Sequence, residues 1–169
     1  MEEVIKFKEE QLSNKYFAFV RDYWEHTPEN ANSPPLAFNM EMYANLHKSG
    51  IVKLMVGRIA NDVIIAAALY IIYPNPKHMP SVVAQCDTFA VSRKWRGQGI
   101  GERLMGHALH MLREVGVNEV INGYREVYGD IVPLFEKLGF ARYERLYRLE
   151  LTARTNVATQ LELPIGETG

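Results

Sequence analysis

The feature that most constrains this chain is a glycine-rich turn between an apolar strand pattern and an amphipathic helix pattern. The turn reads Arg-Gly-Gln-Gly-Ile-Gly-Glu over residues 96–102. Glycine lets successive backbone N–H groups converge on one point without interference from a Cβ atom, and a helix that follows adds a favourable dipole. Arg93, Lys94 and Arg96 supply cations beside the turn. The segment therefore predicts a phosphate-binding turn between a strand and a helix.

The strand expected before this turn, at residues 81–91, carries an acid among apolar and small side chains. Because successive side chains of a strand point to opposite faces, two sets of residues are expected to lie apart. One face would carry Val83, Gln85, Asp87, Phe89 and Val91, and the other Val82, Ala84, Cys86, Thr88 and Ala90. The second face is small enough for a helix to cover it, and the first places a carboxylate beside the turn.

The remaining elements follow from hydrophobic periodicity and from Gly and Pro signals. Helices are predicted at 9–25, 39–48, 99–115 and 130–139, and strands at 51–59, 62–73 and 118–123, with one strand or two short ones at 140–151. The strands at 51–59 and 62–73 should form a hairpin. This order predicts an α/β fold with a mixed sheet flanked by helices. We expect a single domain over residues 1–151 and a tail over 152–169 without a clear period.

Charge and composition disfavour several classes of function and exclude a disulfide scaffold. The chain has 169 residues with 19 Lys+Arg against 20 Asp+Glu, a balance too neutral to favour nucleic acid or an anionic membrane. The longest apolar stretch, Val63–Tyr73, is far shorter than the roughly 20 residues that span a bilayer. The acidic N-terminus is unlike a secretory signal, and a single cysteine excludes an internal disulfide, so we expect a cytoplasmic protein. No His or Cys pair has metal-ligand spacing, so no metal is predicted.

Three phosphate-binding templates compete for the turn. The dinucleotide fingerprint G-x-G-x-x-G fails because Glu102 stands where its third glycine belongs. The Walker turn fails because it needs Gly-Lys-Ser/Thr, and this chain has Gly101-Glu102-Arg103. What remains is Arg-x-x-Gly-x-Gly, spelled by Arg96, Gly99 and Gly101.

That spelling, after Phe89-Ala90-Val91 and before an amphipathic helix, resembles motif A of the GNAT N-acetyltransferase superfamily. Residues 133–140, Pro-Leu-Phe-Glu-Lys-Leu-Gly-Phe, resemble its second motif, L-Y-E-K-x-G-F. The two motifs lie in order and cover roughly residues 50–150. The string at 87–91, the loop containing His78 and the string at 129–134 are also similar to GNAT proteins of phages and prophages.

The resemblance implies the GNAT fold, with a mostly antiparallel central sheet, and a site for acetyl-CoA as co-substrate. Main-chain N–H groups of the turn would hold the pyrophosphate, and the pantetheine arm would lie where two parallel strands splay apart, along the backbone of the first strand. The residues expected at the CoA site are Phe89, Ala90, Val91, Arg96, Gly97, Gln98, Gly99, Ile100, Gly101 and Glu102.

Acetyl transfer to an amine needs a base more than an acid, because amines titrate near 10 and thiols near 8.5. Asp87 is the candidate base, with a capping or arginine-paired carboxylate as the alternative. His78 is a second candidate, unless it is simply solvated. Phe135 stands where the family usually has the tyrosine that donates a proton to the leaving thiolate. Tyr128 or Tyr124 would then supply the phenol that donates this proton, or water would protonate the thiolate.

These observations predict an N-acetyltransferase that acts by direct attack of an amine on the thioester. The alternative is a GNAT-fold regulatory or interaction module that binds CoA without turnover, and a third hypothesis is a general binder of nucleotide phosphates. The acceptor would be a small-molecule or protein amine, in a pocket lined by the loop at 27–35 and the helix after it. A homodimer stays open, and Cys86 is expected to be inert core.

Overall fold

A computed structural model describes residues 3–31, 33–124 and 131–144. Its centre is a sheet of five strands in the order β1-β2-β3-β4-β5. The strands are β1 (Lys6–Glu10), β2 (Val52–Ile59), β3 (Val63–Pro74), β4 (Val82–Val91) and β5 (Glu119–Ile121). The first three neighbouring pairs are antiparallel, and β4 and β5 are parallel. The predicted mixed, mostly antiparallel sheet is confirmed.

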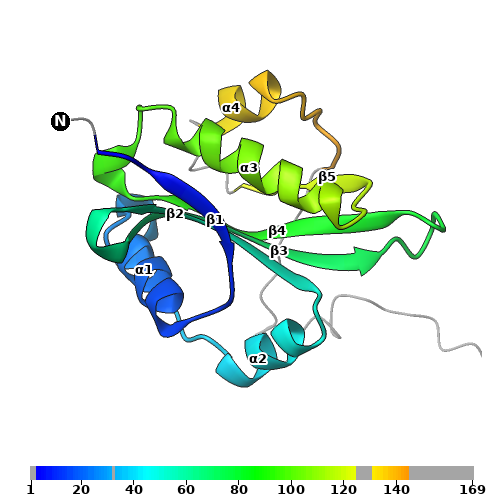
Figure 1. Ribbon diagram of the computed structural model, residues 1–169, viewed down its shortest axis with the longest axis horizontal. Coiled ribbons are helices and arrows are strands. Elements are labelled where there is room, and N and C mark those ends of the chain that lie inside the picture. The colour runs from blue at the N-terminus through cyan, green and yellow to red at the C-terminus, as the bar shows by residue number, and fades with distance from the viewer. Residues whose placement is uncertain (1–2, 32, 125–130, 145–169) are drawn as a thin grey trace, which may run out of the picture.

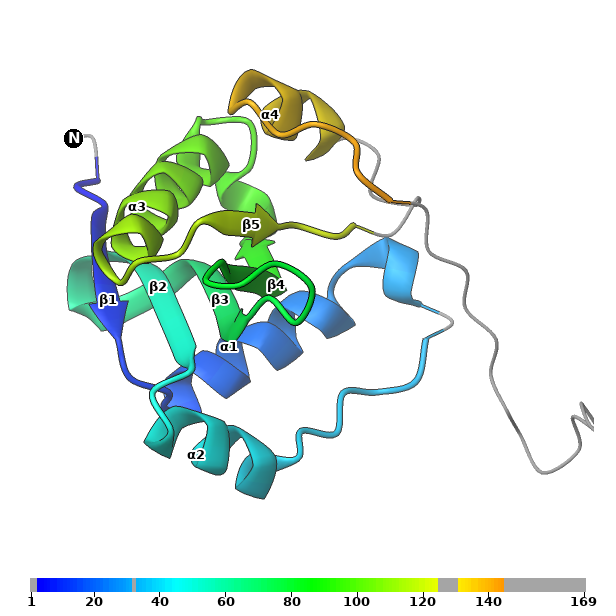
Figure 2. The same cartoon turned by 90° about the vertical axis from the view of Figure 1, so that its right-hand side faces the viewer.

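Helices cover both faces of the sheet (Figures 1 and 2). On one face, α3 (Ile100–Glu114) packs on the strands through side chains that include Leu104, Met105 and Leu112, all fully buried. On the other face, α1 (Asn14–Glu25) packs through Tyr16, Phe17 and Val20. The sheet therefore separates two apolar layers, and the apolar segment at 63–73 is the buried strand between them.

The N-terminal segment differs from the prediction. The helix expected at 9–25 begins at Asn14, after Ser13 accepts a hydrogen bond from the Tyr16 backbone N–H. Residues 6–10 form instead the edge strand β1, paired with β2 from Lys6 opposite Arg58 to Glu10 opposite Leu54. Because Lys-Phe-Lys-Glu-Glu is mostly charged, it lacks the apolar periodicity by which strands are identified.

The hairpin and the two best-defined helices form as predicted. Strands β2 and β3 are joined by a tight turn at Ala60–Asp62, and α2 (Met40–Lys48) begins after its N-cap Asn39. Helix α3 ends before Gly116, whose φ of 83° is in the left-handed region. None of the described helices is long and apolar enough to span a membrane.

A β-bulge in β4 overturns part of the face assignment. Leu69 and Tyr70 of β3 lie opposite Thr88 and Cys86, so Asp87 has no partner in the ladder. The alternation of side chains changes phase there. Cys86 and Phe89 both pack on the α3 side, whereas Asp87 points toward α2. The prediction that Asp87, Phe89 and Val91 share a face is therefore wrong.

The C-terminal part of the fold is shorter than expected. Strand β5 covers Glu119–Ile121, and α4 covers Val132–Lys137 before a turn at Gly139, whose φ is 84°. The predicted strand at 140–151 does not begin in residues 140–144. Residues 145–151 and the tail at 152–169 lie outside the described residues.

Candidate active site

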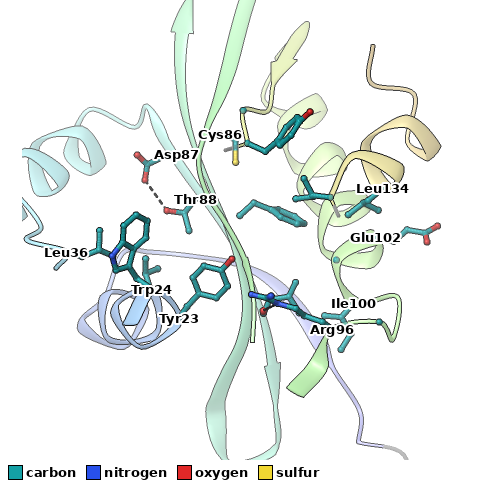
Figure 3. Close-up of a pocket in the computed structure, with 18 of the residues that line it drawn as sticks. Tyr23, Trp24, Leu36, Cys86, Asp87, Thr88, Arg96, Ile100, Glu102 and Leu134 are labelled. Atoms are coloured by element: carbon teal, nitrogen blue, oxygen red, sulfur yellow. Dashed lines mark hydrogen bonds between the residues drawn. The ribbon is translucent and has the colours of Figure 1, made fainter. Parts of the chain in front are cut away.

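A cleft of about 560 Å³ opens where β4, the glycine turn and α1 meet (Figure 3). Phe89, Gly99, Gly101 and Leu134 line it on the α3 side, and Trp24, Leu36, Tyr43 and Asp87 on the α1 side. Figure 3 shows the split, with Asp87 and Thr88 pointing to one side of β4 and Cys86 to the other. The cleft therefore has two chemically different halves that meet across one strand.

The glycine turn has the backbone geometry that its sequence predicts. Gly97 and Gly99 have φ values of 74° and 72°, in the left-handed region, and a Cβ atom at either would meet open space. Gly99 is also the N-cap of α3, and no side chain caps that end. The N–H groups of the first turn of α3 therefore open onto the cleft, where an anion can accept from them.

Arg96 is held across the mouth of the turn. Its Nε donates a hydrogen bond of 3.1 Å to the carbonyl oxygen of Val91, and its guanidinium lies 5.4 Å from the centre of the Tyr23 ring. Both are residues that line the cleft. The charge is thus fixed beside the uncapped end of α3 by the end of β4 and by α1, which suits a phosphate ligand.

The third glycine of the turn has a different role from the other two. A Cβ atom at Gly101 would lie 3.4 Å from Cδ2 of Leu134 and 3.7 Å from the ring of Phe89, so the helix packs closely there on α4 and β4. The next residue, Glu102, forms an ion pair of 2.7 Å with Lys137 of α4. Glu102 therefore links two helices at the edge of the cleft.

Beyond the turn, the edge of β4 is open toward β5. The two strands pair only from Val83 to Gln85, opposite Glu119 to Ile121, whereas β4 continues to Val91. In the described part of the chain, residues 86–91 therefore have no strand on this side. This open edge includes Phe89, Ala90 and Val91, along which the sequence predicts the pantetheine arm to lie.

Asp87 is positioned by two hydroxyl groups. Tyr43 of α2 and Thr88 each donate a hydrogen bond of 3.1 Å to its Oδ2 atom. Burial, together with the nearby Asp87 carboxylate, raises the pKa of the Tyr43 phenol above its ordinary value, so this donor stays protonated at neutral pH. Among the hydrogen bonds of the described residues, both that reach the Asp87 carboxylate end on Oδ2 and none ends on Oδ1.

The opposite face of the bulge holds a buried polar cluster. The hydroxyl of Tyr70 donates to Oδ1 of Asn122, at 3.2 Å, and lies 3.2 Å from the sulfur of Met105. Burial raises the pKa of the adjacent Cys86 thiol to about 12. A thiol of this kind is a poor nucleophile, which agrees with the expectation that Cys86 is inert.

The other candidate residues differ in their distance from the cleft: Tyr124 lines it, and His78 does not. Phe135 is buried, with its ring 6.2 Å from that of Tyr124, and Tyr124 lines the cleft. Tyr128 lies outside the described residues. His78 lies in the exposed loop between β3 and β4, and the described residues that line the cleft do not include it.

Several residues of the cleft were not identified as site residues from the sequence. Tyr23 and Trp24 belong to the aromatic stripe of α1, a pattern that indicates core packing, and Leu36 and Phe38 follow the loop expected to line the acceptor pocket. Tyr43 lies on α2, the helix predicted to line that pocket. Tyr43 lies 44 positions before Asp87 in the sequence, and no local pattern in the sequence indicates that the two side chains are hydrogen-bonded.

The fold and the cleft agree with a family match over most of the chain. Residues 16–140 match the model of the acetyltransferase (GNAT) family. The chain belongs to this family. The prediction made from the two GNAT motifs is thereby confirmed, and with it the GNAT fold.

Individual relatives agree with this GNAT assignment. The N-alpha-acetyltransferase 30 of Schizosaccharomyces pombe is 34% identical over 62 residues, which cover 37% of this chain and 41% of that protein. An acetyltransferase of Trypanosoma brucei is 24% identical with a TM-score of 0.66, over 86% of this chain and 100% of the other. An aminoglycoside N-acetyltransferase in complex with CoA is 13% identical, also with a TM-score of 0.66, over 89% and 97%.

The curated relative is matched over about two fifths of its length, so it identifies a shared part. The two solved structures are less than 25% identical and show the shared GNAT fold. Together with the family match, these names support the predicted N-acetyltransferase activity and the use of acetyl-CoA. Among the described residues, no three His, Cys, Asp or Glu side chains gather to form a metal site.

Proposed function

We propose that this GNAT protein transfers an acetyl group from acetyl-CoA to an amine. The observation that carries the proposal is the placement of two groups in one cleft. The uncapped N-terminus of α3 opens onto its α3 side, and the carboxylate of Asp87 lies on its α1 side. An anionic donor and a cationic acceptor would thus meet at the bulge of β4.

In this proposal Asp87 receives the amine. The bound ammonium group first loses one proton to solvent, because only the neutral amine has the lone pair that attacks. Oδ1 of Asp87 then accepts a hydrogen bond from the acceptor nitrogen and takes the second proton, which the nitrogen loses as it attacks the thioester carbonyl carbon. The C–N bond forms, the C–S bond breaks, and the sulfur leaves as thiolate. The Tyr43 and Thr88 hydroxyls, which bind Oδ2, keep the carboxylate oriented during this step.

The turn and the strand edge hold the donor. The first-turn N–H groups of α3 and the Arg96 guanidinium would bind the pyrophosphate, and the open edge of β4 would pair with the pantetheine arm. A backbone N–H near Phe89 or Ala90 would meet the developing oxyanion, a contribution of roughly 3 kcal/mol in related chemistry.

Tyr124 is the proposed source of the thiolate's proton. It lines the cleft and packs against Phe135, which occupies the family's usual acid position but has no hydroxyl. A thiol titrates near 8.5, so this step needs little assistance and water is a workable substitute. Roles for His78 and Tyr128, a cytoplasmic location, a homodimer and the likeness to phage and prophage proteins stay predictions.

A second candidate function is a module that binds CoA without turnover, and the absence of a phenol at Phe135 favours it. Thermal unfolding with acetyl-CoA, CoA and ATP tests the cofactor site first, because a ligand that binds the native state raises the melting temperature. A rise with both CoA species but not with ATP supports the site. Mass spectrometry of a mixed-amine reaction then separates the candidates, since acetylated product requires turnover.

A further inference from the structure

The α1 side of the cleft carries a group of uncharged, largely apolar side chains beside Asp87. We define the acceptor wall as Val20, Trp24, Leu36, Phe38 and Tyr43, five side chains that line the cleft on this side and carry no charge. Tyr43 contributes its hydroxyl to Asp87, and the Trp24 indole N–H donates to the carbonyl oxygen of Pro34, at 3.2 Å. The polar atoms of these two rings are thus engaged, so the wall offers its apolar surfaces.

The acceptor wall is held in place from behind. The Phe17 ring lies 5.0 Å from Phe38 and 5.4 Å from Tyr43, and Phe17 is itself buried against the sheet. Such a cluster of rings fixes the positions of Phe38 and Tyr43. The wall is therefore a preformed apolar surface, which loses little entropy when it receives a ligand.

The charges around the acceptor wall favour a single cation. Only two acids line the cleft within the described residues, Asp87 and Glu102, and Glu102 is paired with Lys137 at the α3 edge. Two cations lie against aromatic rings on this side of the cleft. The Arg21 guanidinium lies 5.8 Å from the centre of the Phe38 ring, and that of Arg96 lies 5.4 Å from the centre of Tyr23.

We infer that the acceptor is an amine with one positive charge and an apolar body, a small arylalkyl or alkyl amine or a peptide whose first residue is apolar. This inference rests on the proposed function. The ammonium group would bind Asp87 and the body would cover the acceptor wall. A second ammonium group would lose its hydration against the wall, close to Arg21 and without a second unpaired carboxylate among the described residues that line the cleft.

The test compares acceptors that differ in one charge. Hexylamine and hexamethylenediamine have the same length, and phenethylamine and spermidine extend the comparison to an aromatic body and to a triamine. We expect kcat/KM for hexylamine to exceed that for the diamine by about tenfold, a factor worth 1.4 kcal/mol. Equal or faster acetylation of the diamine or of spermidine would overturn the inference. A peptide that begins with leucine and is otherwise neutral separates the two sources of the amine.

The failure of the acceptor class is distinguishable from the failure of the proposed function. If acetyl-CoA raises the melting temperature but none of the monoamines is acetylated, the acceptor class is wrong and the cofactor site stands. If acetyl-CoA has no effect on unfolding, the proposed function itself fails.

A charge placed in the acceptor wall provides an independent test. Leu36 lines the cleft and is half-buried, so Leu36→Glu adds a carboxylate there, and Leu36→Gln is the uncharged control of similar shape. We expect Leu36→Glu to raise the diamine-to-monoamine ratio of kcat/KM about tenfold over Leu36→Gln. An identical ratio in the two variants would mean that the body of the acceptor does not contact this wall.

Discussion

The hydroxyl of Tyr43 lies 3.1 Å from Oδ2 of Asp87. This hydrogen bond joins helix α2 to a residue of β4 that has no partner in the β3 ladder. Helix α2 has no fully buried residue, so this bond, the ring contacts of Tyr43 and the packing of Leu46 on the core position it beside the cleft. The bulge turns Asp87 toward α2, and α2 supplies the partner that fixes the carboxylate. The candidate base is therefore assembled from two elements.

Asp87→Asn is expected to lower kcat/KM about 100-fold, because the amide keeps the shape of the carboxylate but takes no proton. Tyr43→Phe should cost less, about fivefold, since it removes one of two hydrogen bonds to the carboxylate and the bond from Thr88 remains. Because the pKa of Tyr43 is raised, the pH–rate profile should show no tyrosine titration near neutrality. Tyr73→Phe, which removes a 3.2 Å bond to Gln85 on the same sheet, is the matched control. Undiminished turnover in Asp87→Asn would exclude the carboxylate as base.

Gly99→Ala should weaken acetyl-CoA binding and lower the melting temperature by about 3 °C, because alanine pays about 1 kcal/mol in the left-handed region that Gly99 occupies. Gly106→Ala is the control, since Gly106 lies within α3 with open space around it, and alanine there should stabilise the helix by about 0.5 kcal/mol. Calorimetric titration and thermal unfolding measure the two effects. Equal cofactor affinity in both variants would show that the conformation of Gly99 does not matter for binding.

Tyr124→Phe should lower kcat about tenfold and leave the KM for acetyl-CoA unchanged, because the ring stays while the proton donor is lost. A tenfold loss of kcat is smaller than the loss usually seen when a general acid is removed, because a thiolate leaves readily without protonation. Tyr143→Phe, at a side chain that is 75% exposed, is the control. The same kcat in both variants would assign the proton to water.

Cys86 should resist alkylation in the folded protein. With a thiol pKa of about 12, the thiolate fraction at pH 8 is about one in ten thousand, and the thiolate is the reactive form. Iodoacetamide labelling followed by mass spectrometry should be slow in buffer and fast in denaturant. Rapid labelling of the folded chain would contradict this burial of Cys86.

The β1 edge should give stability a defined dependence on pH. Arg58 donates two hydrogen bonds of 2.7 Å to Glu10, and these lower the pKa of the carboxyl group. A carboxylate whose pKa is lower in the folded state stabilises above its unfolded pKa, so Glu10→Gln should cost about 1.5 kcal/mol at pH 7. The difference should shrink as the pH falls below 4.5, the ordinary value for this group.

Denaturant unfolding of both proteins at several pH values measures this difference. Glu9→Gln, which affects the more exposed pair of Glu9 with Lys53, should cost less. A constant difference between pH 7 and pH 3 would rule out the ion pair as its cause.

The sequence predicted those features whose signals are local. The positions of the glycines mark the turn and the ends of α2, α3 and α4, because positive φ angles are required there. Strand β1 was missed because its stability comes from pairing with β2, about fifty residues away. The phase change at Asp87 was missed because an unpaired residue leaves no trace in an alternating pattern.

The aromatic residues of α1 show the same limit at the site. Their spacing predicts the helix and its buried stripe, and Tyr16, Phe17 and Val20 do pack on the sheet. Tyr23 and Trp24, however, line the cleft, and the Tyr23 ring lies against Arg96 of the glycine turn. Periodicity identifies an apolar stripe on a helix, but it does not show which part of the stripe packs on the protein and which part faces a cleft.

The bulge of β4 also divides the protein into parts that can change separately. The residues proposed to contact the donor lie with α3 and the turn, and those proposed to face the acceptor lie on α1, α2 and the segment between them. Leu36, Phe38 and Tyr43 pack with the α1 side of the sheet, whereas Phe89 and Gly101 pack with α3 and Leu134, so we expect substitutions in the first group to leave the second in place. A lineage with this architecture can acquire a new substrate through a few substitutions near residue 40 and keep its coenzyme.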